Sequence, residues 1–306
     1  MRLRISILVL FIVILFIIGC GSNQKINSGK LKIVTTTGMI GDAVINIAGD
    51  KVELTTLMGP GVDPHLYKTT KGDLDLLYNA DIIFYNGLHL EAKMAEILQK
   101  MSSSKTTIAV GEYIDSSHLH YPEHFEGFPD PHVWFDLLLW TQAIEKISVV
   151  LQEKDTLNAP LYRSNTLSLI DTLRVLDSFI RNQIVQIPKE QRVLVTAHDA
   201  FGYFGGAYDI EVKGLQGIST VTEAGLHDVT QMVDMLVNGK IKAVFVESSV
   251  SKKAIYSVVE GCKARDHQII IGGELFSDAM GQPGTPEGTY IGMVRHNVEA
   301  IVSSLK

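Results

Sequence analysis

The strongest constraint on the fold is an uninterrupted helical pattern over residues 159–187, in the middle of the chain. This segment contains no Gly, and no Pro after Pro160, before it stops at Pro188. Apolar residues recur at helical spacing, at Leu167, Ile170, Leu173, Leu176, Ile180 and Ile184. Such a helix is much longer than the average of about 11–12 residues. We expect it to form a rigid connection between two halves of the chain.

Strand and helix patterns alternate on both sides of this segment. Before it, apolar runs predict strands at 31–37, 51–58, 80–86 and 106–111, with helices at 39–49, 70–79, 89–101 and within 132–155. After it, strands are predicted at 192–199, 210–217, 243–248 and 268–273. Alternation at this spacing predicts an α/β fold of two lobes, each a mainly parallel β-sheet flanked by helices, joined by one long rigid helix.

The boundaries follow from these patterns. We expect an N-terminal lobe at 31–155, a connecting helix at 156–188 and a C-terminal lobe at 189–306. The chain has 306 residues, 46% of them hydrophobic and 20% charged. This length and composition suffice for two lobes with cores of their own.

The first 19 residues have a different character. Arg2 and Arg4 precede the apolar run "ISILVLFIVILFII", which is shorter than the roughly 20 residues that span a bilayer. We therefore predict a signal peptide at 1–19. The following "IIGC" resembles the lipobox of bacterial lipoproteins, which implies lipidation of Cys20, with residues 20–30 as a tether. A free N-terminal anchor helix is the alternative.

Charge and cysteine content exclude other classes of protein. Loss of Arg2 and Arg4 with the signal peptide takes the formal net charge from −7 to −9. Such an acidic chain does not favour nucleic-acid binding, which requires a basic face. Cys262 is the only cysteine besides Cys20, so no disulfide can form between two thiols of the mature domain. We expect Cys262 to be a buried helix residue.

The tripeptide Asp-Pro-His occurs twice, at 63–65 and at 130–132. Proline fixes its own φ and disfavours helical conformation in the residue before it, so each His follows a stiff corner. Two ordinary turns are the alternative interpretation, because Asp-Pro is a common turn initiator. Each corner could nevertheless direct an imidazole toward a site.

Further polar residues lie at the ends of predicted strands, where open parallel sheets bind ligands. Three imidazoles and a carboxylate together would suit Zn²⁺ and also Mn²⁺. Each His could equally be an isolated hydrogen-bonding group, and Asp278 could be a helix N-cap. The candidates for a common site are His65, His132, His198, Glu247, Glu274 and Asp278.

Five ordered segments resemble the zinc- and manganese-binding lipoproteins of ABC importers. They are "GVDPHLYKTTKGDLDLLYNADIIFYNGLHLE" (61–91), "DPHVWFD" (130–136), "VTAHDAFGYFGGAY" (195–208), "LQGISTVTEAG" (215–225) and "GELFSDAMG" (273–281). The resemblance implies one metal ion, Zn²⁺ or Mn²⁺, in a cleft between the lobes, with His65, His132, His198 and Asp278 as its ligands. It excludes Glu247 and Glu274 from direct binding.

The resemblance also carries expectations about partners and location. It implies a monomer that is not an enzyme, held outside the cytoplasmic membrane by its N-terminal lipid alone, that delivers the ion to an ABC permease and its ATPase. Members associated with manganese carry Glu where this chain has His198. Asp63 and Asp130 could orient neighbouring groups, although sequence alone cannot pair them.

Two other functions remain open from the residues alone. An exported zinc hydrolase could use the same His cluster, with Glu247 or Glu274 as its base if Asp278 does not bind the metal. A role in cell adhesion has no aromatic-rich contact patch to support it. Loop 112–130 contains His118, His120 and His124, and we expect a solvated loop and no accessory metal site.

Overall fold

The computed structural model describes residues 29–123, 125 and 127–306. The predicted signal peptide, Cys20, most of the tether and His124 lie outside these residues. Residues Leu31–Lys306 form one compact unit. Within the described residues, no helix combines the length and apolar character needed to cross a membrane.

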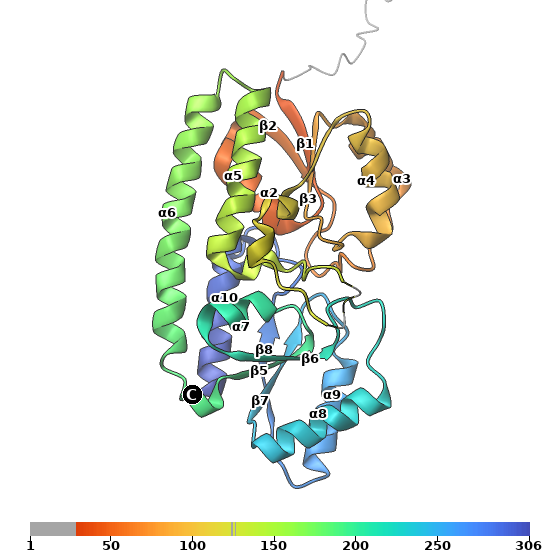
Figure 1. The fold of residues 1–306 in the computed structure, drawn as a ribbon, viewed down its shortest axis with the longest axis vertical. Coiled ribbons are helices and arrows are strands. Elements are labelled where there is room, and N and C mark those ends of the chain that lie inside the picture. Colours follow the sequence, from red (N-terminus) through yellow and green to blue (C-terminus); the bar gives the residue numbers. More distant parts are fainter. Residues whose placement is uncertain (1–28, 124, 126) are drawn as a thin grey trace, which may run out of the picture. The chain divides into compact units, whose positions relative to one another are not determined.

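The first half of this unit is built on a parallel four-stranded sheet (Figure 1). Its strand order is β2-β1-β3-β4, with in-register pairs such as Ile33 with Leu54 and with Ile82. The strands are β1 (Leu31–Thr35), β2 (Val52–Thr56), β3 (Ile82–Tyr85) and β4 (Thr106–Ala109). The helices are α2 (Gly38–Ala48), α3 (Lys71–Asn79), α4 (Ala95–Ser102) and α5 (Leu137–Lys154). All four strands were predicted from their apolar runs.

The second half also contains parallel strands, arranged as two pairs. β5 (Val193–His198) pairs with β6 (Glu211–Gln216), and β7 (Ala243–Glu247) pairs with β8 (Ile270–Leu275). β5 and β7 lie side by side, but hydrogen-bonded pairing is confined to the two ladders. The helices around these strands are α7 (Gly202–Tyr208), α8 (Leu226–Gly239), α9 (Lys253–Lys263) and α10 (Tyr290–Leu305). Cys262 is fully buried in α9, as expected.

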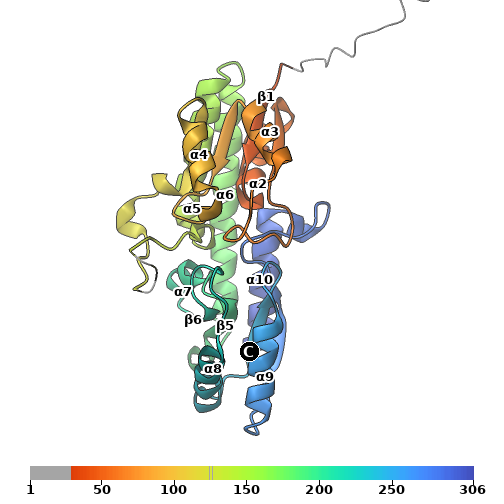
Figure 2. The same ribbon diagram turned by 90° about the vertical axis from the view of Figure 1, so that its right-hand side faces the viewer.

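The long central helix is α6 (Ala159–Ile184), and it runs beside both halves (Figures 1 and 2). It packs against α2 and α5 of the first half and against α7 and α10 of the second. It ends at Ile184, before the predicted 187, and the chain continues in tighter turns in which Gln186 and Ile187 donate to the carbonyls of Gln183 and Ile184. Leu167 was assigned to the buried stripe, but it is 59% exposed. The neighbouring Leu169 is buried in its place.

One apolar core is shared by the two halves. It includes Ile47 and Trp134 from the first half, Leu173 from α6, and Phe201 and Tyr290 from the second half. Each half also has one smaller apolar cluster of its own, which lies under its outer helices. The shared core means that each half buries apolar surface against the other as well as against its own helices.

Candidate metal centre

The fold brings His65, His132, His198 and Asp278 together in the interior, although they are far apart in the sequence. His65 lies in the loop between β2 and α3, His132 precedes the short 3-10 helix η5 (Val133–Phe135), His198 ends β5, and Asp278 follows β8. All four are at most 2% exposed. Their potential ligand atoms lie within 4.8 Å of one another.

The separations of these atoms fit a single small cation. His132 Nε2 lies 3.3 Å from His65 Nε2 and 3.3 Å from Asp278 Oδ1, and His198 Nε2 lies 3.2 Å from Asp278 Oδ2. A tetrahedron with bonds of about 2.0–2.1 Å to Zn²⁺ has edges of about 3.3–3.4 Å. His65 Nε2 is farther from Asp278 Oδ2, at 4.0 Å. Both oxygens of Asp278 face imidazoles, and neither has a hydrogen-bond partner among the described residues.

Asp130 orients the His132 ring. Its Oδ1 lies 2.7 Å from His132 Nδ1 and accepts the His132 backbone N–H at 2.9 Å. This contact leaves Nε2 facing the site. Burial opposes a charge on this ring, but the carboxylates of Asp130 and Asp278 outweigh burial and raise the pKa of His132 to about 9. The second Asp-Pro-His corner therefore carries its own orienting carboxylate.

Glu247 orients the His198 ring in the same way. Oε1 of this fully buried residue accepts the His198 backbone N–H at 2.9 Å, and Oε2 lies 2.6 Å from His198 Nδ1. Burial disfavours the imidazolium, yet Glu247 and Asp278 raise the pKa of His198 well above its usual value. Sequence reasoning placed Glu247 at the end of β7 but did not assign it this role. The signal that could have indicated this role is that Glu247 and His198 end two strands, β7 and β5, which lie side by side.

His65 has no carboxylate behind its ring. Asp63 accepts the His65 backbone N–H at 2.8 Å, but no hydrogen bond to Nδ1 of the ring is found among the described residues. Burial lowers the pKa of His65 to about 3, and the nearby imidazoles of His132, His198 and His89 lower it further against the attraction of Asp278. The pKa of Asp278 itself is held well below its usual value: burial would raise it, but His198 and His132 prevail.

Other predicted candidates lie outside the cluster. Glu274 forms an exposed ion pair with Lys252. Asp278 is not a helix N-cap, because no helix begins at this position. His118 and His120 are both exposed, as expected, and His120 also stacks on the Tyr203 ring with centroids 4.3 Å apart. The stacking of His120 on Tyr203 of α7 could not be predicted from the sequence of loop 112–130, because the two residues are far apart in the chain.

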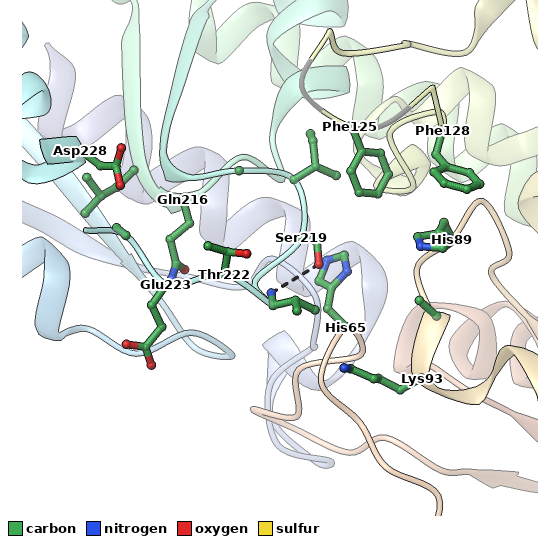
Figure 3. A pocket seen from close by; sticks show the side chains of 16 residues that line it. His65, His89, Lys93, Phe125, Phe128, Gln216, Ser219, Thr222, Glu223 and Asp228 are labelled. Atoms are coloured by element: carbon green, nitrogen blue, oxygen red, sulfur yellow. Dashed lines mark hydrogen bonds between the residues drawn. The ribbon is translucent and has the colours of Figure 1, made fainter. Parts of the chain in front are cut away.

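A cavity of about 590 Å³ reaches the cluster from the surface (Figure 3). Of the four clustered residues, His65 lines this cavity and the other three do not. One wall comes from the first half, with His89 and Lys93, and the opposite wall from the segment after β6, with Ser219 and Thr222. His65 is thus the member of the cluster that borders the cavity.

Known proteins resemble this chain over nearly its whole length. Residues 33–304 match the family described as zinc-uptake complex component A, periplasmic (ZnuA). The manganese-binding lipoprotein MntA of Bacillus subtilis is 49% identical over 290 residues, which cover 94% of each chain. The zinc-binding protein TroA of Treponema pallidum is 47% identical over 93% of this chain and 92% of that one. The solved structure of that TroA superposes with a TM-score of 0.89 at 48% identity, covering 90% of this chain and 99% of the other.

Proposed function

Since the chain belongs to the zinc-uptake complex component A family, we propose that His65, His132, His198 and Asp278 hold one divalent transition-metal ion for import. The chain is a metal-binding substrate-binding protein of an ABC importer and not an enzyme. Proteins of this kind work with a permease and an ATPase.

The observation that carries the ligand assignment is the convergence of three imidazole nitrogens and one carboxylate in a buried place. Their spacing is that of atoms around one cation, and among the described residues the oxygens of Asp278 face imidazole nitrogens without accepting a hydrogen bond of good geometry. A buried carboxylate is costly, so a cation between it and the imidazoles would stabilise the arrangement. The carboxylates of Asp130 and Glu247 support two of the rings in the manner usual for metal-bound imidazoles.

The nitrogen-rich set favours Zn²⁺ over Mn²⁺ in equilibrium affinity. The relatives divide between the two metals, since one is named for manganese and the other for zinc. We propose that either ion can enter this site and that Zn²⁺ binds more tightly. Competition between the two metals for the purified protein measures this order directly.

The exported hydrolase considered from the residues alone is not supported. The relatives are named as metal-binding proteins of importers. With Asp278 among four protein ligands, little room remains for the water that a catalytic zinc requires. Of the two candidate bases, Glu247 contacts His198 and Glu274 pairs with Lys252 outside the cluster.

Anchoring and assembly complete the proposal. We propose that Cys20 is lipidated and tethers the protein to the outer side of the cell membrane; its likeness to a lipobox and a relative named as a lipoprotein support this. We propose a monomer, because one chain supplies all four ligand residues. Radiolabelled fatty acid should be incorporated into the wild-type protein and not into Cys20→Ser.

Alanine substitutions test the ligand set. His65→Ala and His198→Ala should each weaken Zn²⁺ binding sharply, because each removes a nitrogen ligand from a closed site. His118→Ala is the matched control on the exposed loop and should bind like the wild type. Competition with a chromogenic chelator provides the affinities. If His118→Ala abolished binding of the single ion while His198→Ala did not, the ligand assignment would be wrong.

A further inference from the structure

The four clustered residues are not held equally. Glu247 fixes the His198 ring and Asp130 fixes the His132 ring, while the Asp278 segment is held by Asn297, whose side chain bonds both the N–H and the carbonyl of Phe276. His65 lacks such a support on its ring. It is also the residue that closes the site toward the surface cavity. The exchange of metal by the shortest route therefore requires His65 to move.

The His65 loop is built to allow this movement. It begins with Gly59, Pro60 and Gly61, and Gly61 has φ of +72°, a conformation that favours glycine. Leu57 and Met58 still donate to the carbonyls of Thr35 and Thr36, but among the described residues 59–69 of the loop no strand or helix hydrogen bonding is found. Its position is instead set by side-chain contacts, of which the Asp63 carboxylate makes two.

Asp63 ties the His65 loop to the opposite half of the molecule. Oδ1 accepts the backbone N–H of His65 at 2.8 Å, and Oδ2 accepts the hydroxyl of Thr220 at 2.5 Å. Thr220 belongs to the segment 217–225 between β6 and α8. Among the described residues, this is the only hydrogen bond found between that segment and the first half.

The segment 217–225 borders empty space as well. It lines the 590 Å³ cavity and a second one of about 480 Å³, and both are bounded by Glu223 and Ala224. A segment next to two cavities has fewer packed neighbours than one inside a core and can shift at lower cost. The Thr220 hydroxyl therefore holds together two movable segments that form the wall between the metal site and the surface.

We propose that the Asp63–Thr220 hydrogen bond is a latch that controls metal exchange: when it breaks, the His65 loop and segment 217–225 separate and the ion passes through the cavity. This inference rests on the proposed metal site. Asp63 and Thr220 touch the ion in neither state and act as positioning residues, through His65.

The test is the rate at which the protein, loaded with one Zn²⁺, loses the metal to excess chelator in stopped flow. Thr220→Val keeps the shape of the side chain and removes its hydroxyl, and should release the metal about tenfold faster, because a hydrogen bond to a carboxylate is lost. Thr220→Ser retains the hydroxyl and should restore nearly the wild-type rate. Thr230→Val, at an exposed threonine on α8 that borders neither cavity, is the control and should not change the rate.

A double variant tests whether the two residues act through their shared bond. Asp63→Ala should speed release, and adding Thr220→Val should speed it no further. Release from Thr220→Val at the wild-type rate, or equal acceleration by Thr230→Val, would overturn the latch. Equilibrium titration of the wild type separates the two ideas: failure to bind one ion refutes the metal site, whereas normal binding with an unchanged release rate refutes only the latch.

Discussion

At the scale of single residues, the carboxylates behind the imidazoles should affect metal binding as strongly as the four proposed ligands do. Glu247 contacts both the backbone N–H and the ring Nδ1 of His198, so it fixes the ring orientation and attracts a proton or a cation. Asp130 does the same for His132. These partners set the direction of each Nε2 before any ion arrives, which lowers the cost of ordering the site.

Glu247→Gln should weaken Zn²⁺ binding by about 10–100-fold, because it removes the negative charge that supports His198 while nearly preserving the size of the side chain. Glu274→Gln, at an exposed carboxylate that pairs with Lys252, is the control and should leave affinity unchanged. Chelator competition measures both variants. Equal affinities for the wild type and Glu247→Gln would show that this carboxylate does not support the metal.

Protons should compete with the metal over an unusually wide pH range. An imidazole must be neutral to bind a metal, yet neighbouring carboxylates raise the pKa of His132 to about 9 and the pKa of His198 well above its ordinary value. His65, with a pKa of about 3, remains neutral throughout this range. Metal binding at pH 7 should therefore release up to about two protons, and affinity should rise from pH 6 to pH 9. Calorimetry in buffers of different ionisation enthalpy counts these protons, and a count of zero would contradict the assignment.

At the scale of elements, local pattern predicted most of the structure. The eight predicted strands are all present, since apolar runs between turn residues determine them locally. The helix predicted at 89–101 begins later, with α4 at Ala95, because Gly87, Leu88 and His89 have positive φ values. The residue types Leu88 and His89 do not predict positive φ values. The buried Glu91 stabilises this conformation by accepting hydrogen bonds from the backbone N–H groups of Asn86 and Gly87.

Contacts between distant residues set the limit of sequence reasoning. His198 and Glu247 are 49 residues apart, and Thr220 and Asp63 are 157 apart. Strand and helix ends could be located from the pattern, so six candidates could be named, and only the family resemblance reduced them to four. Which carboxylate faces which imidazole depends on strand order and side-chain packing, and this information is not local.

The central helix offers a test of packing with matched leucines. Leu173 is 1% exposed in the shared core, and Leu167, six residues earlier on another face of α6, is 59% exposed. Leu173→Ala should lower the free energy of unfolding by about 2–5 kcal/mol, through lost burial and the cavity left behind. Leu167→Ala should change it by less than about 0.5 kcal/mol. Urea denaturation of the metal-free protein compares them, and equal effects would contradict the assigned buried face.

At the scale of the whole molecule, α6 and the shared core restrict how the halves can move. Phe135 of the first half stacks on Phe201 of the second with centroids 4.4 Å apart, and Tyr290 donates a hydrogen bond to the Trp134 carbonyl. Wide separation would break these contacts and expose the core. Metal exchange therefore fits local movement of loops near His65 better than opening of the entire cleft.

Metal loading should accordingly change the relative orientation of the halves only slightly. Crystal structures or solution scattering with and without Zn²⁺ would measure the change. A rotation of tens of degrees would show that α6 and the shared core are not rigid in this sense.

The central claim is that four residues from the two halves hold one ion, and diffraction from crystals of the Zn²⁺-loaded protein at the zinc absorption edge tests it most directly. The account predicts a single anomalous peak about 2.0–2.2 Å from Nε2 of His65, His132 and His198 and from the Asp278 carboxylate. A peak elsewhere, or one that lacks any of these four residues as a ligand, would contradict it.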